Sequence, residues 1–201
     1  MFDKISDLFS SGPELPDLIV VLDLEEWYVN LTDEQREKLH EHSTFFGTSG
    51  GSNLLEQDVV ETSQSSQEYL KGVGATAANA KDYEFAEFVL LTALERNDGS
   101  VTSTHFTYNE LIDVYYKQRD DREKCINYCK KDIKIAEEFV TEFGEVPRIP
   151  SFKRLAIIYE KRGQYDKAIA VCEQALDIGT TDGTQGGFEG RKERLLNKRV
   201  D

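Results

Sequence analysis

Cysteine, proline and long apolar runs are scarce in this chain of 201 residues, which has three Cys and four Pro. The Cys count is odd and no two Cys have CxxC spacing, so a disulfide framework is not indicated. Apolar runs such as Leu18 to Leu22 are far shorter than the roughly 20 residues that cross a bilayer. The opening MFDKISDLFSSG lacks a basic region followed by an apolar one. We therefore expect a cytoplasmic protein with reduced thiols and no membrane partner.

Basic residues are also few, with 24 Lys and Arg against 38 Asp and Glu and a net charge of −14. Phosphate groups and anionic membranes both attract basic side chains, so we expect neither nucleic acid nor a membrane surface as a partner. The charge is uneven. Residues 1–60 hold 13 acidic and 3 basic side chains, whereas residues 145–201 hold 11 basic and 9 acidic. This pattern fits a soluble acidic surface, or attraction between the two ends within or between chains.

Signatures of catalysis and of metal or cofactor binding are missing from the sequence. It contains neither G-x-S-x-G nor H-E-x-x-H, and SGGS at 49–52 lacks the Lys-Ser/Thr ending of a phosphate-binding loop. His40 and His42 are two residues apart, and such a pair points in different directions on a helix. No third ligand accompanies them, so a metal site is not expected. We expect a protein that is not an enzyme and that uses no cofactor.

The most informative stretch is residues 150–179, PSFKRLAIIYEKRGQYDKAIAVCEQALDIG. Apolar residues at helical spacing predict a helix that ends near Gly163, since Gly readily adopts the positive φ of a helix end. A second set predicts another helix, whose small residues let the two backbones approach closely. The stretch therefore predicts an antiparallel helical hairpin. The two sets are Phe152, Leu155, Ala156 and Tyr159, and then Tyr165, Ala168, Cys172, Ala175 and Leu176.

This hairpin resembles the tetratricopeptide repeat, a helix-turn-helix unit of about 34 residues. The repeat has an apolar residue, a Leu followed by Gly or Ala, a Tyr, a turn Gly, an aromatic residue, two Ala and often a closing Pro. Here Gly179 ends the helix in place of the Pro. The alternative is any other antiparallel helical hairpin. The matching residues are Phe152, Leu155, Ala156, Tyr159, Gly163, Tyr165, Ala168 and Ala175.

Two less regular units of the same kind precede this one. In the first, Lys81 stands where the turn Gly is expected; in the second, Asp132 replaces a small Ala, and the second helix is predicted to run on to Gly144. Cys125 and Cys129 take small-residue places, which favours packing over a metal or redox role. The first unit is carried by Leu70, Val73, Gly74, Ala77, Tyr83, Ala86, Leu90, Ala93 and Leu94. The second is carried by Tyr108, Leu111, Ile112, Tyr115, Cys125 and Cys129.

The three units predict an all-α fold, a right-handed superhelix of three antiparallel helix pairs over residues 59–201. The pairs span about 67–100, 105–140 and 149–182, and a capping helix follows at 187–200. Residues 1–58 are predicted as an acidic segment with one or two helices, docked or flexible. Within it, residues 17–29 fit a strand or a helix, and Thr32 with Gln35 predicts a helix start. The strings HFTYNELIDVYYKQRDD and DGTQGGFEGR are similar to those of a prokaryotic group of small tetratricopeptide-repeat proteins, which implies no particular function.

The resemblance implies that the first helix of each repeat lines a concave groove that binds a protein or peptide. The groove positions of the family, carried over residue by residue, form a mixed wall of aromatic, apolar, amide and charged side chains. We therefore expect a protein- or peptide-binding scaffold. The predicted partner-binding residues are Lys71, Asn79, Phe106, Asn109, Asp113, Tyr116, Lys117, Lys153, Ile157 and Glu160.

One subtype of the family grips an acidic chaperone tail with Lys, Asn and Arg side chains at set groove positions. Lys71 and Arg154 match that subtype, but Ala75, Glu110 and Pro150 do not, which argues against this ligand. Three alternatives stay open. The protein self-associates into a homo-oligomer through the solenoid ends or the N-terminal segment; residues 1–60 form a small enzyme or ligand-binding domain; or those residues fill the groove themselves.

Overall fold

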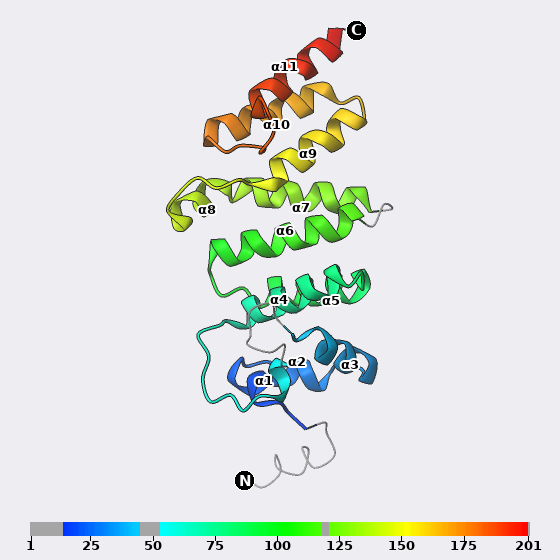
Figure 1. Ribbon diagram of the computed structural model, residues 1–201, viewed down its shortest axis with the longest axis vertical. Helices are drawn as coiled ribbons and strands as arrows, with labels where there is room; N and C mark the ends of the chain where they lie inside the picture. Colours follow the sequence, from blue (N-terminus) through cyan, green and yellow to red (C-terminus); the bar gives the residue numbers. More distant parts are fainter. Residues whose placement is uncertain (1–13, 45–52, 118–120, 201) are drawn as a thin grey trace, which may run out of the picture. The chain divides into compact units, whose positions relative to one another are not determined.

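A computed structural model describes residues 14–44, 53–117 and 121–200, and every regular element in those ranges is helical (Figure 1). The predicted all-α class is confirmed for this part of the chain, and α4 pairs with α5, α6 with α7 and α9 with α10. None of the described helices is both long and apolar enough to cross a membrane. Residues 49–52 and the start of the chain lie outside the described ranges. The elements are α1 (Asp17–Val21), α2 (Glu25–Val29), α3 (Asp33–His42), η2 (Leu54–Glu56), α4 (Ser66–Asn79), α5 (Tyr83–Glu95), α6 (Val101–Lys117), α7 (Arg122–Lys134), α8 (Ala136–Phe143), α9 (Pro150–Lys161), α10 (Tyr165–Ile178) and α11 (Gly187–Val200).

The chain divides into two compact units, Met1–Asp98 and Gly99–Asp201. This division differs from the predicted boundary between residues 58 and 59, because the first predicted helix pair is tied to the helices before it. Helix α4 packs on α3, and the buried Tyr69 hydroxyl of α4 hydrogen bonds to Ser43 Oγ at 2.8 Å. The α4/α5 pair therefore belongs to the first unit.

Residues 17–29 form two short helices, α1 and α2, which rules out the strand alternative for this segment. Between them Asp23 adopts a left-handed φ of 54°. Ile19 is fully buried, and the Trp27 ring stacks on Phe88 of α5 with 6.3 Å between ring centroids. The single Trp is therefore a packing contact inside the first unit.

Two helices of the first unit begin with a capping box, in which a hydroxyl and a side-chain carbonyl satisfy two free backbone N–H groups. At α3, Thr32 accepts from the Gln35 N–H and Gln35 accepts from the Thr32 N–H. Ser65 and Glu68 form the same pair of bonds at α4. The helix start predicted at Thr32 is confirmed.

The α4/α5 pair is packed closely enough to require a glycine. A Cβ atom on Gly74 would lie 2.5 Å from the Leu90 side chain of α5, well inside van der Waals contact. The turn after α4 contains Lys81, whose φ of 68° is left-handed although the residue is not Gly. The close packing therefore depends on Gly74, and the turn holds a residue with a Cβ atom in a conformation that favours Gly.

The helix after α6 is not continuous to Gly144, so that prediction is wrong. Helix α7 ends at Lys134, Ile135 closes it with φ −96° and ψ 4°, and α8 begins at Ala136. Buried Ala136 and Phe139 then pack α8 against α6. The residues that lengthen this unit therefore form a separate short helix that turns back.

Helix α8 supplies the cap of α6 from about forty residues further along the chain. The Glu142 carboxylate accepts hydrogen bonds from Ser100 Oγ at 2.8 Å, from the Val101 N–H at 3.0 Å and from the Thr102 N–H at 2.9 Å. Hydrogen bonds from Thr102, Ser100 and Val101 lower the pKa of Glu142 to about 2. Helix α8 thereby caps the N-terminus of α6.

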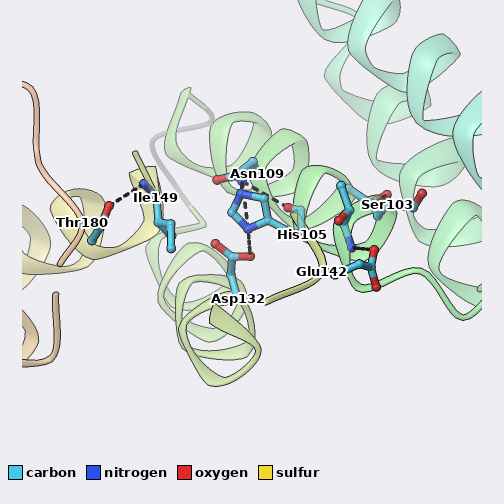
Figure 2. Close-up of polar contacts among 9 residues, drawn as sticks. Ser103, His105, Asn109, Asp132, Glu142, Ile149 and Thr180 are labelled. Atoms are coloured by element: carbon cyan, nitrogen blue, oxygen red, sulfur yellow. Dashed lines mark hydrogen bonds and ion pairs between the residues drawn. The ribbon is translucent and has the colours of Figure 1, made fainter. Parts of the chain in front are cut away.

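Two hydrogen bonds of a threonine hydroxyl and an aromatic contact hold the last helices in place. Thr180 Oγ1 accepts from the Ile149 N–H at 3.1 Å (Figure 2). It also donates to the Pro147 carbonyl at 2.7 Å, and the two bonds fix the entry to α9. Helix α11 packs on α10, and its buried Phe188 ring meets Phe152 edge-on at 6.3 Å. Residues 187–200 thus form the helix predicted there.

Candidate functional site

Helices α6 and α9 pack against each other and carry eight of the ten predicted partner-binding residues. We call the surface formed by Asp113, Tyr116, Lys153, Arg154 and Ile157 the α6/α9 face. The remaining two predicted residues lie on α4, in the first unit. On α6 lie Phe106, Asn109, Asp113, Tyr116 and Lys117; on α9 lie Lys153, Ile157 and Glu160; on α4 lie Lys71 and Asn79.

Tyr116 lies against two guanidinium groups. The Arg154 guanidinium carbon is 3.7 Å from the ring centroid and that of Arg122 is 4.0 Å away. Arg122 also donates to the Tyr116 carbonyl at 2.9 Å, and Arg154 donates to Asp113 Oδ1 at 2.8 Å. Such contacts between cations and aromatic rings are attractive and limit side-chain freedom. Tyr116 is therefore held in place before any partner arrives.

A pocket of about 330 Å³ opens beside this stack. Its lining combines three cationic side chains with the apolar surface of Ile157. Lys153 Nζ donates to the Asp182 carbonyl at 3.0 Å, which joins α9 to the loop after α10. The lining residues are Arg148, Pro150, Lys153, Arg154, Ile157 and Asp182.

The carboxylate of Asp182 is already occupied by other groups. It accepts from Arg191 Nη2 at 3.1 Å and from the Thr184 N–H at 2.9 Å. Burial acts to raise the pKa of Asp182, but the bonds from Thr184 and Arg191 lower it overall, so the group stays ionised. Because Arg191 neutralises this carboxylate, the pocket keeps an excess of positive charge from Arg148 and Lys153.

Glu160 and Phe106 make contacts that the sequence did not indicate. The Glu160 carboxylate lies 2.7 Å from Lys198 Nζ and 3.6 Å from Arg191 Nη1, so it anchors α11. Phe106 is 40% exposed and meets Phe143 of α8 edge-on, with 6.4 Å between centroids. Glu160 is thus engaged within the unit, and Phe106 forms part of an aromatic surface at α8.

Asn109 is oriented by a buried histidine–aspartate pair (Figure 2). His105 Nδ1 lies 2.7 Å from Asp132 Oδ1 on α7, and Asn109 Nδ2 donates to His105 Nε2 at 2.8 Å. The imidazole also stacks on Phe139 at 3.7 Å. These contacts fit the tautomer in which Nδ1–H donates to the carboxylate. His105 was not among the predicted residues. The sequence hinted at such a partner only through Asp132, which stands where the repeat favours Ala.

Three residues of this site region, Arg122, Arg148 and Asp182, were not predicted. Arg122 is the first residue of α7, Arg148 lies two residues before α9, and Asp182 lies in the loop after α10. None of them occupies a helix position that the repeat pattern assigns to a groove. In the sequence, Arg148 could be recognised only as a basic residue two positions before Pro150.

All three thiols lie inside the second unit. Cys125, Cys129 and Cys172 are buried and free. A hydrogen bond with Cys129 lowers the pKa of Cys125, whereas burial raises the pKa of Cys172 to about 11. No three His, Cys, Asp or Glu side chains gather into a possible metal site within the ranges that the structure covers.

Residues 151–185 match the tetratricopeptide repeat family. The matched span contains most of α9, the turn at Gly163 and all of α10. It is the most regular of the three predicted units, so the resemblance is confirmed for this repeat. No curated protein and no solved structure matched the chain.

Proposed function

We propose, starting from the tetratricopeptide repeat at residues 151–185, that the protein is an interaction scaffold that binds a peptide segment of a protein partner on the α6/α9 face. A repeat of this family suggests protein binding in general. The observation that supports the finer proposal is the pocket of about 330 Å³, whose lining includes Arg148, Lys153 and Arg154 together with Ile157.

The chemistry of the pocket favours a segment with an acidic group next to an apolar side chain. Guanidinium and ammonium groups bind carboxylates through charge-assisted hydrogen bonds, which are stronger than neutral ones. Ile157 offers an apolar contact in the same pocket. The contacts of Arg122 and Arg154 with the Tyr116 ring limit side-chain freedom beside it, which lowers the entropy cost of binding. The proposed ligand is therefore an acidic peptide with at least one apolar anchor.

We propose a role that is not enzymatic and a cytoplasmic location. Self-association into a homo-oligomer is a further prediction. The right-handed superhelix also stays a prediction. A groove that would include Lys71 and Asn79 stays a prediction as well, because those two residues lie in the first unit.

A displayed random-peptide library tests the binding proposal. The full chain is immobilised, selected peptides are synthesised, and their Kd values are measured for the wild type and for an Arg148→Ala, Lys153→Ala variant. Each charge-assisted bond contributes about 1.5–3 kcal/mol, so we expect the variant to bind at least about tenfold more weakly. The matched control is Lys161→Ala, an exposed residue of α9 outside the pocket. Failure to enrich any peptide, or equal loss in the control, would contradict the proposal.

A further inference from the structure

Exposed aromatic side chains gather where α8 packs on α6 in the second unit (Figure 1). Phe106 of α6 is 40% exposed and Phe143 of α8 is 41% exposed, with 6.4 Å between their ring centroids. Val146, in the loop after α8, is 48% exposed. Single apolar residues are common on protein surfaces, whereas apolar side chains that gather in a patch mark interaction sites.

The two exposed rings rest on a buried aromatic base. Phe139, one turn before Phe143 on α8, is buried. Its ring centroid lies 5.9 Å from that of Phe106 and 5.3 Å from that of Phe143. Phe139 in turn stacks on His105, which Asp132 holds. These contacts limit the motion of the exposed rings, which lowers the entropy cost of binding a partner.

Carboxylates accompany the exposed rings, and cations are missing from this stretch of the chain. Residues 136–147 include four Glu and no Lys, Arg or His. Glu138 and Glu142 lie one turn apart on α8, on the helix stripe next to that of Phe143. Glu145 follows Phe143 by two residues, and Glu138 and Glu145 are both exposed. We call Phe106, Phe143, Glu138, Glu142 and Glu145 the α6/α8 surface.

Glu142 places a fixed negative charge beside the rings. Hydrogen bonds from Thr102, Ser100 and Val101 lower its pKa to about 2, so this carboxylate is ionised at neutral pH. Thr102 lies one turn before Phe106 on α6, which brings the charge close to the exposed rings. The α6/α8 surface is therefore both apolar and negatively charged.

A guanidinium group fits both properties of this surface. The face of an aromatic ring attracts a cation, and a planar guanidinium stacks on a ring while it donates to a carboxylate. The same unit already contains this arrangement. Arg154 lies 3.7 Å from the centroid of the Tyr116 ring and donates to Asp113 at 2.8 Å.

We propose that the α6/α8 surface binds a segment of a protein partner in which an arginine lies next to an apolar residue. The arginine stacks on an exposed ring and pairs with the carboxylates of Glu138 and Glu145, and the apolar residue covers the rest of Phe106 and Phe143. Charge complementarity of this kind selects the partner and fixes its orientation. The α6/α9 face carries cations and the α6/α8 surface carries carboxylates, so the two surfaces select segments of opposite charge.

Two synthetic peptides test this proposal. Both carry Leu residues in a flexible Gly-Ser sequence. One peptide has Arg on either side of each Leu, and the other has Glu at the same positions. Their Kd values are measured by fluorescence anisotropy with the full chain, with a Glu138→Lys, Glu145→Lys variant and with a Phe143→Ala variant. Circular dichroism checks the folding of each variant.

The matched control is a Glu189→Lys, Glu193→Lys variant. It changes the net charge by the same amount, but it alters exposed carboxylates of α11 instead. A chain with a net charge of −14 attracts any basic peptide to some extent, and this control measures that attraction.

We expect the wild type to prefer the Arg peptide. The Glu138→Lys, Glu145→Lys variant should bind that peptide at least about fivefold more weakly, the factor that two exposed ion pairs together contribute. Phe143→Ala should weaken binding about threefold through loss of the contact between cation and ring. The α11 control should bind nearly as the wild type does.

Three results would overturn the proposal: no binding of the Arg peptide, unchanged binding by the α8 variants, or equal weakening in the α11 control. The Arg148→Ala, Lys153→Ala variant should bind the Arg peptide as the wild type does, because it alters only the α6/α9 face. This proposal is independent of peptide binding on that face, so its failure would leave the proposed function standing.

Discussion

Lys81 and Gly163 occupy the same place in two helical turns, although only one of them is Gly. Their φ angles are 68° and 67°. In each turn the next residue donates its N–H to the carbonyl five residues back, at 2.9 Å. This is the hydrogen bond of a Schellman cap, which requires a left-handed residue at this place. A residue with a Cβ atom loses about 1–2 kcal/mol in that conformation.

Replacement of Lys81 by Gly should therefore stabilise the first unit. We expect Lys81→Gly to raise the free energy of unfolding by about 0.5–1 kcal/mol, since relief of the strained φ exceeds the entropy that Gly loses on folding. Urea unfolding followed by fluorescence is the measurement, because Trp27 is the only Trp and packs on Phe88 inside this unit.

Lys81→Ala separates backbone strain from loss of the lysine side chain. Ala keeps the Cβ atom and so keeps the strain, and we expect less than half of the gain seen with Gly. Equal stabilisation by Ala and Gly would mean that the lysine side chain, rather than the backbone, is responsible.

The buried His105–Asp132 pair shows how far the roles of single residues could be predicted from the sequence. Asp132 was recognised as a departure from the small residue of the repeat, but its reason lay 27 residues earlier in the chain. Asp132 is fully buried because His105 lies 2.7 Å from it and shields it from water. A pairing of this kind joins two helices, and no local pattern in the sequence records it.

Among the helices, α8 is the clearest addition to the two helices that each repeat needs. Its Glu142 caps the start of α6, and the hydrogen bonds from Thr102, Ser100 and Val101 lower the pKa of that carboxyl to about 2 from an ordinary value of 4.5. A carboxyl with a depressed pKa stabilises the fold above its ordinary pKa. That stabilisation is lost as the pH falls from about 4.5 through 2.

This linkage predicts a stability difference that depends on pH. At pH 7 we expect Glu142→Gln to lower the midpoint of thermal unfolding of the second unit by a few degrees, because a neutral amide accepts these bonds more weakly. The difference from the wild type should shrink steadily below pH 4.5 and vanish near pH 2. Circular dichroism melts at several pH values measure it.

Glu138→Gln is the control, because Glu138 is an exposed carboxylate on the same helix. It should leave the midpoint nearly unchanged at every pH. A difference for Glu142→Gln that persists unchanged from pH 7 to pH 2 would show that the cap does not depend on the charge of Glu142.

The helical hairpins were predictable because their signals are local. Apolar spacing and the turn at Gly163 lie within one short stretch, and α9 and α10 follow the pattern closely. The break at Ile135 was not predictable, because apolar spacing continues through it to Phe139. What ends α7 is the return of α8 toward α6, and that contact is not local.

At the scale of the molecule, the net charge belongs to one unit. Residues 1–98 hold 20 acidic and 6 basic side chains, whereas residues 99–201 hold 18 of each. The sequence showed an uneven charge but not where the units divide, since that division depends on contacts such as Tyr69 with Ser43. The second unit is neutral overall, and three of its cations, Arg148, Lys153 and Arg154, line the pocket of the α6/α9 face.

The central claim is that the α6/α9 face is a peptide-binding surface. The most direct test is an NMR titration of the isotope-labelled full chain of 22.9 kDa with a peptide selected from the displayed library. We predict that the largest chemical-shift changes fall on the amides of Tyr116, Lys153, Arg154 and Ile157, and that they are reduced in the Arg148→Ala, Lys153→Ala variant. Largest changes confined to residues 14–98, or equal in the wild type and the variant, would contradict the claim.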